Sequence, residues 1–154
     1  MKVIGNCIGA GTENAYGINE WYGSVYDADA SHNPTTYLGF VTENAIFNRN
    51  NAANGVSGAT ADLCTLPVDN FFVRYKMRRN FPAGQYSITV GGDDGYRFSI
   101  NGGATWVDEL SNYILQSYGS KTAVICLDGS TDMVLEYFEN GGNSQVSFNY
   151  SQVI

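Results

Sequence analysis

Two adjacent carboxylates, Asp93 and Asp94, are the residues whose type and spacing point most directly to chemistry. They lie in the glycine-framed segment 91–95, which reads Gly-Gly-Asp-Asp-Gly. Neighbouring carboxylates repel each other, so a cation between them best explains the pair, and calcium is the first candidate. The same residue types are common in tight hairpin turns, where solvated acids need no ligand. The segment alone therefore leaves two interpretations open, a metal loop and a plain turn.

A second loop offers further oxygen ligands. Residues 139–143 read Glu-Asn-Gly-Gly-Asn, a stretch rich in acceptors and in glycine. Calcium takes about six to eight oxygen ligands from carboxylates, amide carbonyls, backbone carbonyls and water. The Asn140 side chain and the backbone carbonyls of residues 141–144 would supply such ligands beside Asp93 and Asp94. The spacing of an EF-hand is not present, so the ion would be held by two loops that are far apart in the sequence.

Alternation of apolar and polar residues predicts that short β-strands carry both loops. Strands are expected over residues 21–26, 37–41, 70–77, 86–90, 96–101, 122–127, 132–138 and 145–150. Turn residues predict hairpins at 91–95 and 128–130, a turn at 81–84 and a long loop over 44–61. With almost no helical periodicity, the fold class is all-β, an antiparallel β-sandwich. Loops gather at the ends of a sandwich, so 91–95 and 139–143 should lie side by side.

The length of 154 residues favours a single domain over 1–154, and the charge limits what it binds. A net charge of −7 argues against nucleic acid and anionic membranes as partners, because binding to them depends on Lys and Arg. No apolar run approaches the ~20 residues of a membrane helix, and the first residues lack the basic and apolar regions of a secretion signal. The chain as given is expected to be soluble, with neutral or cationic ligands open to it.

Several single side chains carry weaker expectations. His32 lies in a polar loop and is expected to be solvated, because no Ser or Cys nucleophile can be matched to it from spacing. Trp106 is expected in the core, with stacking on a sugar as its competing role. Glu136 and Glu139 are expected to face solvent at a strand end rather than to form a catalytic pair.

The three cysteines, Cys7, Cys64 and Cys126, allow at most one disulfide within the chain. Their spacing matches no zinc pattern. Cys126 lies in the apolar run 124–127 and is expected to be a buried small hydrophobe. A bridge between Cys7 and Cys64 is open but has no support in the sequence.

Four motifs resemble those of the PA-fourteen domain, the protective-antigen-type β-sandwich of toxins, yeast flocculins and epithelial adhesins, and bacterial adhesins and glycosidases. They are Phe-Pro-Ala-Gly-Gln-Tyr at 81–86, Gly-Asp-Asp-Gly-Tyr-Arg-Phe at 92–98, Gly-Gly-Ala-Thr-Trp-Val at 102–107 and Leu-Glu-Tyr-Phe-Glu-Asn-Gly-Gly at 135–142. The resemblance is specific from about residue 70 to the C-terminus and looser before it. It implies a jelly-roll-like sandwich with long loops at one end.

The resemblance also implies a site. In sugar-binding members, paired aspartates joined by a cis peptide bond hold calcium, and the ion coordinates neighbouring sugar hydroxyls directly. Asp93 and Asp94 match this pair, and the second calcium loop of the family, with an Asn side chain and backbone carbonyls, falls on residues 140–144. The implied metal ligands are Asp93, Asp94, Asn140, Gly142 and Ser144. The implied sugar contacts are Asp93, Asp94, Asn140, Gly141 and Asn143.

These features favour a calcium-dependent carbohydrate-binding (lectin) module that is not an enzyme. The expected ligand is a neutral mono- or oligosaccharide, on a cell-surface glycan or a polysaccharide. The chain is expected to be a monomeric module of a larger protein, secreted or at the cell surface, and not inserted in a membrane. The alternative is a structural or protein-binding adhesin module in which calcium only stiffens the loops.

A glycosidase is disfavoured, because hydrolysis needs two carboxyls roughly 5 to 9.5 Å apart that face each other across the bond. Sequence-adjacent aspartates in one tight loop rarely provide that geometry. Residues 44–61 and 111–118, which are rich in amide side chains, are candidate specificity elements.

Overall fold

The computed structural model describes residues 9–52, 60–63 and 67–154, and within them the chain is built from β-strands. The strands are β1 (Gly17–Ile18), β2 (Glu20–Ala28), β3 (Pro34–Asn44), β4 (Phe47–Ala52), β5 (Thr60–Leu63), β6 (Phe71–Asp93), β7 (Tyr96–Ser99), β8 (Gly119–Glu139) and β9 (Ser144–Gln152). One short 3-10 helix, η1 (Asp108–Leu110), precedes β8. Apart from the two-residue parallel pairing of β1 with β6, the strands pair antiparallel, so the predicted all-β class is confirmed.

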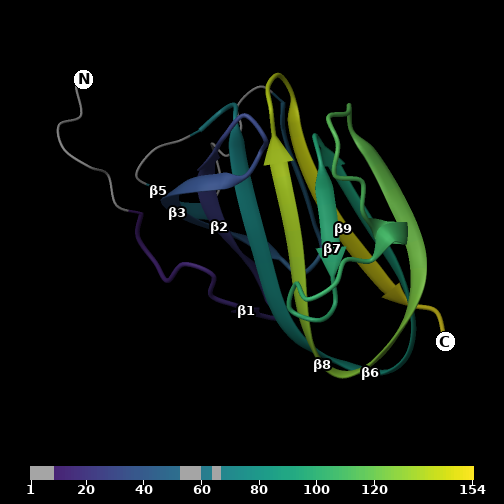
Figure 1. The fold of residues 1–154 in the computed structure, drawn as a ribbon. Coiled ribbons are helices and arrows are strands. Elements are labelled where there is room, and N and C mark those ends of the chain that lie inside the picture. The colour runs from purple at the N-terminus through teal and green to yellow at the C-terminus, as the bar shows by residue number, and fades with distance from the viewer. Residues whose placement is uncertain (1–8, 53–59, 64–66) are drawn as a thin grey trace, which may run out of the picture.

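Two long strands, β6 and β8, run through the whole molecule as one antiparallel ladder. Their register runs from Phe71 opposite Glu139 to Gly92 opposite Gly119, with one irregularity between Phe81 and Gly84. At that point both strands bend together, as the lower part of Figure 1 shows. Each strand therefore contributes one half to each layer of the sandwich.

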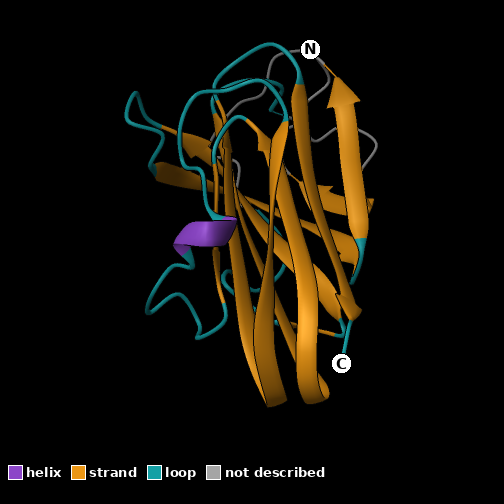
Figure 2. Cartoon of the chain, turned by 90° about the vertical axis from the view of Figure 1, so that its right-hand side faces the viewer, coloured by secondary structure: helices purple, strands orange, loops and turns teal. Residues whose placement is uncertain are grey.

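The first layer has the strand order β5-β3-β2-β6-β8-β7 and uses the N-terminal half of β6. The second layer has the order β4-β9-β6-β8 and uses its C-terminal half, residues 86–93. Figure 2 shows the two layers edge-on, with the loops gathered mainly at one end. The predicted sandwich is thus present, with two strands shared between its layers.

This sharing corrects three predictions of local structure. Residues 81–84 and 128–130 were expected to be turns, but each lies within a continuous strand, so 122–138 is not a hairpin. Residues 86–101 are not a hairpin either, because β7 pairs with β8 rather than with β6. The segment 91–95 instead carries the chain from one layer to the other. Separately, residues 44–61, expected to be a loop, contain β4 and the first two residues of β5.

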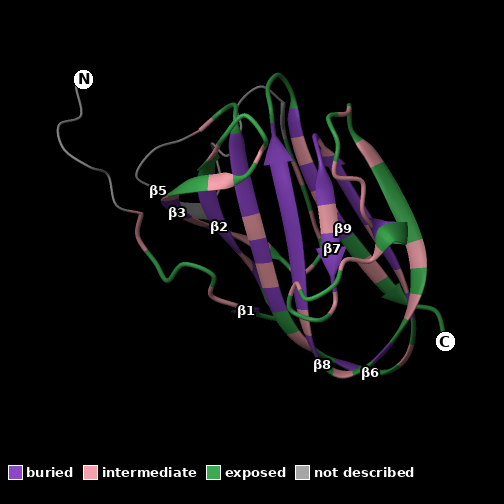
Figure 3. Ribbon diagram, viewed as in Figure 1, coloured by how far each residue is buried: buried purple, intermediate pink, exposed green. Residues whose placement is uncertain are grey.

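The core lies between the layers and is strongly aromatic. Phe71, Val73, Tyr75 and Met77 alternate along β6 and are all buried, as their period of two predicts. Trp21 packs edge-on against Phe148 of the opposite layer, with ring centroids 5.0 Å apart. Figure 3 shows the buried positions along the central strands of both layers. This packing fixes the register of β6, β8 and β9, and hence the positions of the loops that follow them.

Some single residues lie where the sequence did not predict. Cys126 is exposed rather than buried, because it lies on the face of β8 opposite to Ile125 and Leu127, which face the core. Trp106 is half-buried, with the Arg97 guanidinium 4.2 Å above its ring, so it is not a core anchor. His32 is half-buried and stacks on Phe138 at 4.3 Å rather than being fully solvated.

Cys7 and Cys64 lie outside the described residues, so their pairing stays a prediction. Within residues 9–52, 60–63 and 67–154, no helix is long and apolar enough to cross a membrane.

Candidate metal and ligand site

The two loops singled out in the sequence lie side by side at one end of the sandwich, as predicted. The Asn140 backbone N–H donates a hydrogen bond of 2.8 Å to Asp94 Oδ2. The Asp94 backbone N–H in turn donates to the carbonyl of Phe138, at 3.2 Å. The peptide bond between Asp93 and Asp94 is cis, as the resemblance implied. The loop at the end of β6 is therefore fixed against the loop at the end of β8.

Three carboxylates converge where these loops meet. One oxygen from each of Asp93, Asp94 and Glu139 lies within 4.8 Å of the others. Glu139 is completely buried, Asp94 is 7% exposed and Asp93 is half-buried, so the cluster opens to solvent on the side of Asp93. The Tyr137 hydroxyl donates to the backbone carbonyl of Asp93 at 2.8 Å and so supports the loop from below.

In the part of the chain that the structure describes, no protein cation balances the charges of this cluster. Each ion pair among the described residues joins an arginine to Glu43, Glu136 or Asp132, and none includes Asp93, Asp94 or Glu139. Glu139 Oε1 is buried without a hydrogen-bond partner in the described ranges. Such an atom is costly to bury, and a bound cation would relieve that cost.

The pKa values of the cluster reflect the same imbalance. Burial, followed by the neighbouring charges of Asp94 and Asp93, raises the pKa of Glu139 to about 9. Burial, followed by the charge of Asp94, also raises the pKa of Asp93. A divalent cation would reverse this situation, because an opposite charge favours the ionised form of a carboxylate. The carboxylate oxygens are of the kind that calcium prefers, so the donor set fits that ion.

A third segment, residues 111–118, holds Asp94 from the other side. The Gln116 backbone N–H donates to Asp94 Oδ1 at 3.0 Å, and its side-chain amide donates to the Asp94 carbonyl at 3.1 Å. The same amide also donates to the backbone carbonyl of Asn112, and the Asn112 side-chain Nδ2 donates to Gln116 Oε1 in return. Each Asp94 oxygen thus accepts one backbone N–H and keeps capacity for a further ligand. The sequence did not predict this contact, since an isolated glutamine in a loop carries no pattern.

The other predicted site residues lie around the cluster without being shown to bind anything. Asn140, Gly141, Gly142 and Asn143 are exposed on the loop, and Gly142 has a positive φ of 79°, which glycine adopts readily. Ser144 is buried at the start of β9, opposite Ala52 of β4. Their assignments as metal ligands and sugar contacts stay predictions.

Glu139 is the member of the cluster that sequence reasoning missed, and its expected exposure is wrong. The buried residues Met133, Leu135 and Tyr137 alternate along β8, and Glu139 continues the same face. This period of two was the available signal, because alternate residues of a strand share one side. Glu136, on the opposite face, was also expected to be exposed and is buried.

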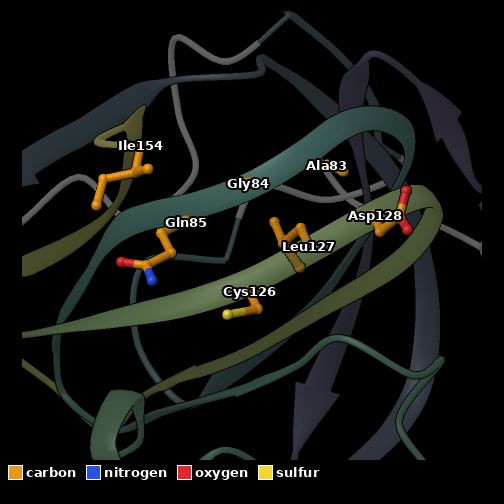
Figure 4. A pocket seen from close by; sticks show the side chains of 7 residues that line it. All are labelled: Ala83, Gly84, Gln85, Cys126, Leu127, Asp128 and Ile154. Carbon is orange, nitrogen blue, oxygen red and sulfur yellow. The ribbon is translucent and has the colours of Figure 1, made fainter.

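A separate hollow lies far from these carboxylates. It has a volume of about 440 Å³ and is lined by Ala83, Gly84, Gln85, Cys126, Leu127, Asp128 and Ile154 (Figure 4). Gln85 and Asp93 are eight residues apart on β6, a distance of about 26 Å along a strand. The hollow follows from the bend of β6 and β8 and shares no residue with the carboxylate cluster.

Solved structures with the same fold include PA14 (PA-fourteen) domains. The PA14 domain of the MpAFP antifreeze protein superposes with a TM-score of 0.64 and 18% identity, covering 94% of this chain and 88% of that one. The PA14 sugar-binding domain of an RTX adhesin gives a TM-score of 0.63 and 19% identity, covering 88% and 91%. The A domain of epithelial adhesin 9 from Candida glabrata, solved with Galβ1-3GlcNAc, gives 0.54 and 13%, covering 96% and 87%.

No protein-family model matches the sequence, and neither does any curated protein. The structural likenesses lie below 20% identity and therefore speak to the fold. The chain has a PA14-type fold.

Proposed function

We propose that this chain is a calcium-dependent carbohydrate-binding module that acts outside the cell or at its surface. The observation that carries the proposal is the cluster of Asp93, Asp94 and Glu139, in which one oxygen of each lies within 4.8 Å of the others and no cation of the described residues pairs with them. Such a cluster at an open end of the sandwich suits a divalent cation that also contacts a ligand. An acidic protein with a net charge of −7 suits a neutral sugar once that cation is bound.

The residues of the two loops would have two roles, as ligands of the ion and as contacts to the sugar. Asp93 and Asp94 would hold the ion, with the Asn140 side chain and the Gly142 and Ser144 carbonyls as further ligands. When bound, calcium would supply open coordination positions for two neighbouring sugar hydroxyls. Asn140, Gly141 and Asn143 are exposed and would contact the sugar from the loop.

The names of similar structures support carbohydrate as the ligand class. The RTX adhesin domain is described as sugar-binding, and the epithelial adhesin domain was solved with a disaccharide. Both proteins are adhesins, which favours a role at the cell surface for a larger protein that carries this module as a monomeric unit. An antifreeze protein also contains the fold, so the fold alone does not decide the ligand.

Two other functions fit the site less well. A glycosidase needs two accessible carboxyls on either side of a sugar bond, but Glu139 is completely buried and Asp93 and Asp94 are neighbours in one loop. A structural calcium site, in which the ion only stiffens the loops, fits the buried Glu139. A purely structural site would, however, give no role to the side of the cluster that opens to solvent at Asp93.

The test is a glycan-array screen of the purified protein, run with calcium and again with a chelator. The Asp93→Asn variant keeps the side-chain shape and removes one charge from the cluster. We expect binding to a defined group of neutral glycans that disappears with chelator and in this variant, because a metal site of this kind depends on carboxylate charge. Asp128→Asn, an exposed aspartate at the bend, is the matched control and should bind as the wild type does.

Two outcomes would count against the proposal. If calcium raises the melting temperature but no glycan binds, the site is structural. If glycans bind equally with chelator, the carboxylate cluster is not the ligand site.

A further inference from the structure

A shallow trough of about 370 Å³ lies on the second layer of the sandwich, over strands β4, β9 and β6. Its polar lining comes from Asn48, Thr89, Tyr118, Ser147 and Asn149. Ile46, Phe47 and Phe148 complete the lining, although the Phe47 and Phe148 rings pack against Trp21 of the core, and no charged residue lines the trough. Its volume is within the range of about 300 to 1,000 Å³ that is usual for small-molecule sites.

The trough and the carboxylate cluster lie along the same two paired strands. Thr89 of β6 pairs with Asn149 of β9, and two residues further on Gly91 pairs with Ser147. Another two residues bring the ladder to Asp93. Alternate residues of a strand share one face, and two residues span about 6.6 Å. The trough therefore begins within about one or two sugar lengths of the carboxylates.

Tyr118 forms a wall between the two places. Its hydroxyl is hydrogen-bonded to Ser147 Oγ at 2.7 Å, and its side chain is 41% exposed. It passes close over Gly91, where an added Cβ would lie 2.7 Å from the tyrosine hydroxyl. Glycine at this position is what allows the tyrosine to lie there. The same segment, 111–118, carries Gln116, which holds Asp94.

We propose that this trough is a second sugar subsite, which makes the ligand an oligosaccharide of at least two residues rather than a single terminal sugar. The inference rests on the proposed function, since the first sugar would be held at the carboxylate cluster. Hydroxyls and amides of the lining match the donors and acceptors of a neutral sugar, and the Tyr118 ring offers an apolar face for stacking. Within the described residues, the exposed Asn149 side chain has no hydrogen-bond partner and is available to a ligand.

The experiment compares chain lengths of sugar by calorimetry in calcium. The probes are methyl glycosides of mannose, glucose, galactose and fucose, and di- and trisaccharides that end in the same residues. We expect the wild type to bind at least one oligosaccharide more tightly than its matched methyl glycoside. In Asn149→Ala this gain should fall about two- to tenfold, as for the loss of one hydrogen bond, and in Tyr118→Ala it should fall at least as much because the stacking face is lost, with methyl glycoside binding unchanged in both. Ser151→Ala, an exposed position further along β9 and outside the trough, is the control.

The outcomes separate this inference from the proposed function. If oligosaccharides bind no more tightly than methyl glycosides, the subsite is refuted while the calcium-dependent site stands. The subsite is also refuted if the variants weaken the binding of methyl glycosides and of oligosaccharides alike. If no probe binds although calcium raises the melting temperature, the proposed function fails and the subsite fails with it. Tyr118 and Asn149 are both exposed, so both variants are expected to fold.

Discussion

Glu136 and Glu139 lie three residues apart on β8 and are both buried, yet the chain balances only one of their charges. Glu136 lies between Arg74 of β6 and Arg97 of β7 and forms ion pairs with both, one of them 2.6 Å from Arg74 Nε to Glu136 Oε2. Glu139 lies instead beside two further carboxylates. The first arrangement is complete within the protein. The second is the arrangement expected of a site that takes its cation from solution.

The environment of Arg97 strengthens the contrast. Its guanidinium stacks on Trp106 at 4.2 Å and on Tyr113 at 4.7 Å while it pairs with Glu136. The chain thus holds this cation in place on three sides. At the carboxylate cluster it holds the acids in place instead, through Gln116, Asn140 and Tyr137. Rigid acids without a partner make a preorganised cation site.

The largest expected effect comes from Glu136→Gln. This change leaves Arg74 and Arg97 without their carboxylate, and breaking a buried pair of this kind costs about 3 kcal/mol of unfolding free energy. Urea denaturation should show the same loss with calcium and with chelator, because Glu136 belongs to no metal site. A loss that appears in only one of the two conditions would contradict the contrast between the glutamates.

Glu139→Gln should raise the unfolding free energy in chelator, whereas Glu136→Gln lowers it. The variant removes the need to keep a buried carboxyl protonated at pH 7, so its unfolding free energy should rise, by at most about 3 kcal/mol. Calcium should stabilise the variant less than it stabilises the wild type, because one carboxylate has been lost. A variant that is less stable than the wild type in chelator would show that Glu139 has a purely structural role.

The pH dependence of the wild type provides the control for this variant. The pKa of Glu139 is raised from 4.5 to about 9, so in that window the folded state holds a proton that the unfolded state has lost. Stability in chelator should therefore fall as pH rises from 5 to 8. The ion pair with Arg78 lowers the pKa of Asp132, so its contribution is lost only in more acidic solution. In the Glu139→Gln variant, stability in chelator should fall less steeply between pH 5 and 8 than in the wild type.

Gln116→Ala should have the smallest effect. Its backbone N–H still donates to Asp94 Oδ1, and only the side-chain bonds to Asp94 and Asn112 are lost. Calcium affinity, measured by calorimetry, should fall about three- to tenfold with little change in stability in chelator. Gln85→Ala, an exposed position beside the bend of β6 and eight residues from Asp93, is the matched control and should bind calcium normally. Unchanged affinity in Gln116→Ala would mean that the loop at 111–118 does not position the site.

Local patterns predicted the strands well and their connections poorly. The alternation of Phe71 to Met77 marked a buried face correctly, because a half-buried strand needs that period. The glycine at 129 was interpreted as a hairpin turn, although in the structure β8 continues through it beside the bend of β6. Gly, Asp and Ser favour a bend as readily as a turn. Pairing with a partner strand decides between a bend and a turn, and that strand is distant in the sequence.

For the site, the sequence located the two loops but not the whole set of acids. Asp93 and Asp94 were conspicuous because they are adjacent and framed by glycine. Glu139 was not, since a glutamate at a strand end is usually solvated, and its burial depends on which face of β8 meets the core. Gln116 could not be found at all, because its contact with Asp94 joins residues 22 positions apart without any repeating pattern.

The direction of β6 and β9 has a mechanical consequence. β6 ends and β9 starts at the carboxylate cluster, and the C-terminal end of β9 lies beside the bend of β6, where Gln85 is hydrogen-bonded to Val153 and Ile154 (Figure 1). A pull between a ligand held at the cluster and the C-terminal end would act along the strands. The eight residue pairs from Tyr86–Gln152 to Asp93–Gln145 would then share the load in shear, instead of opening one after another like a zipper.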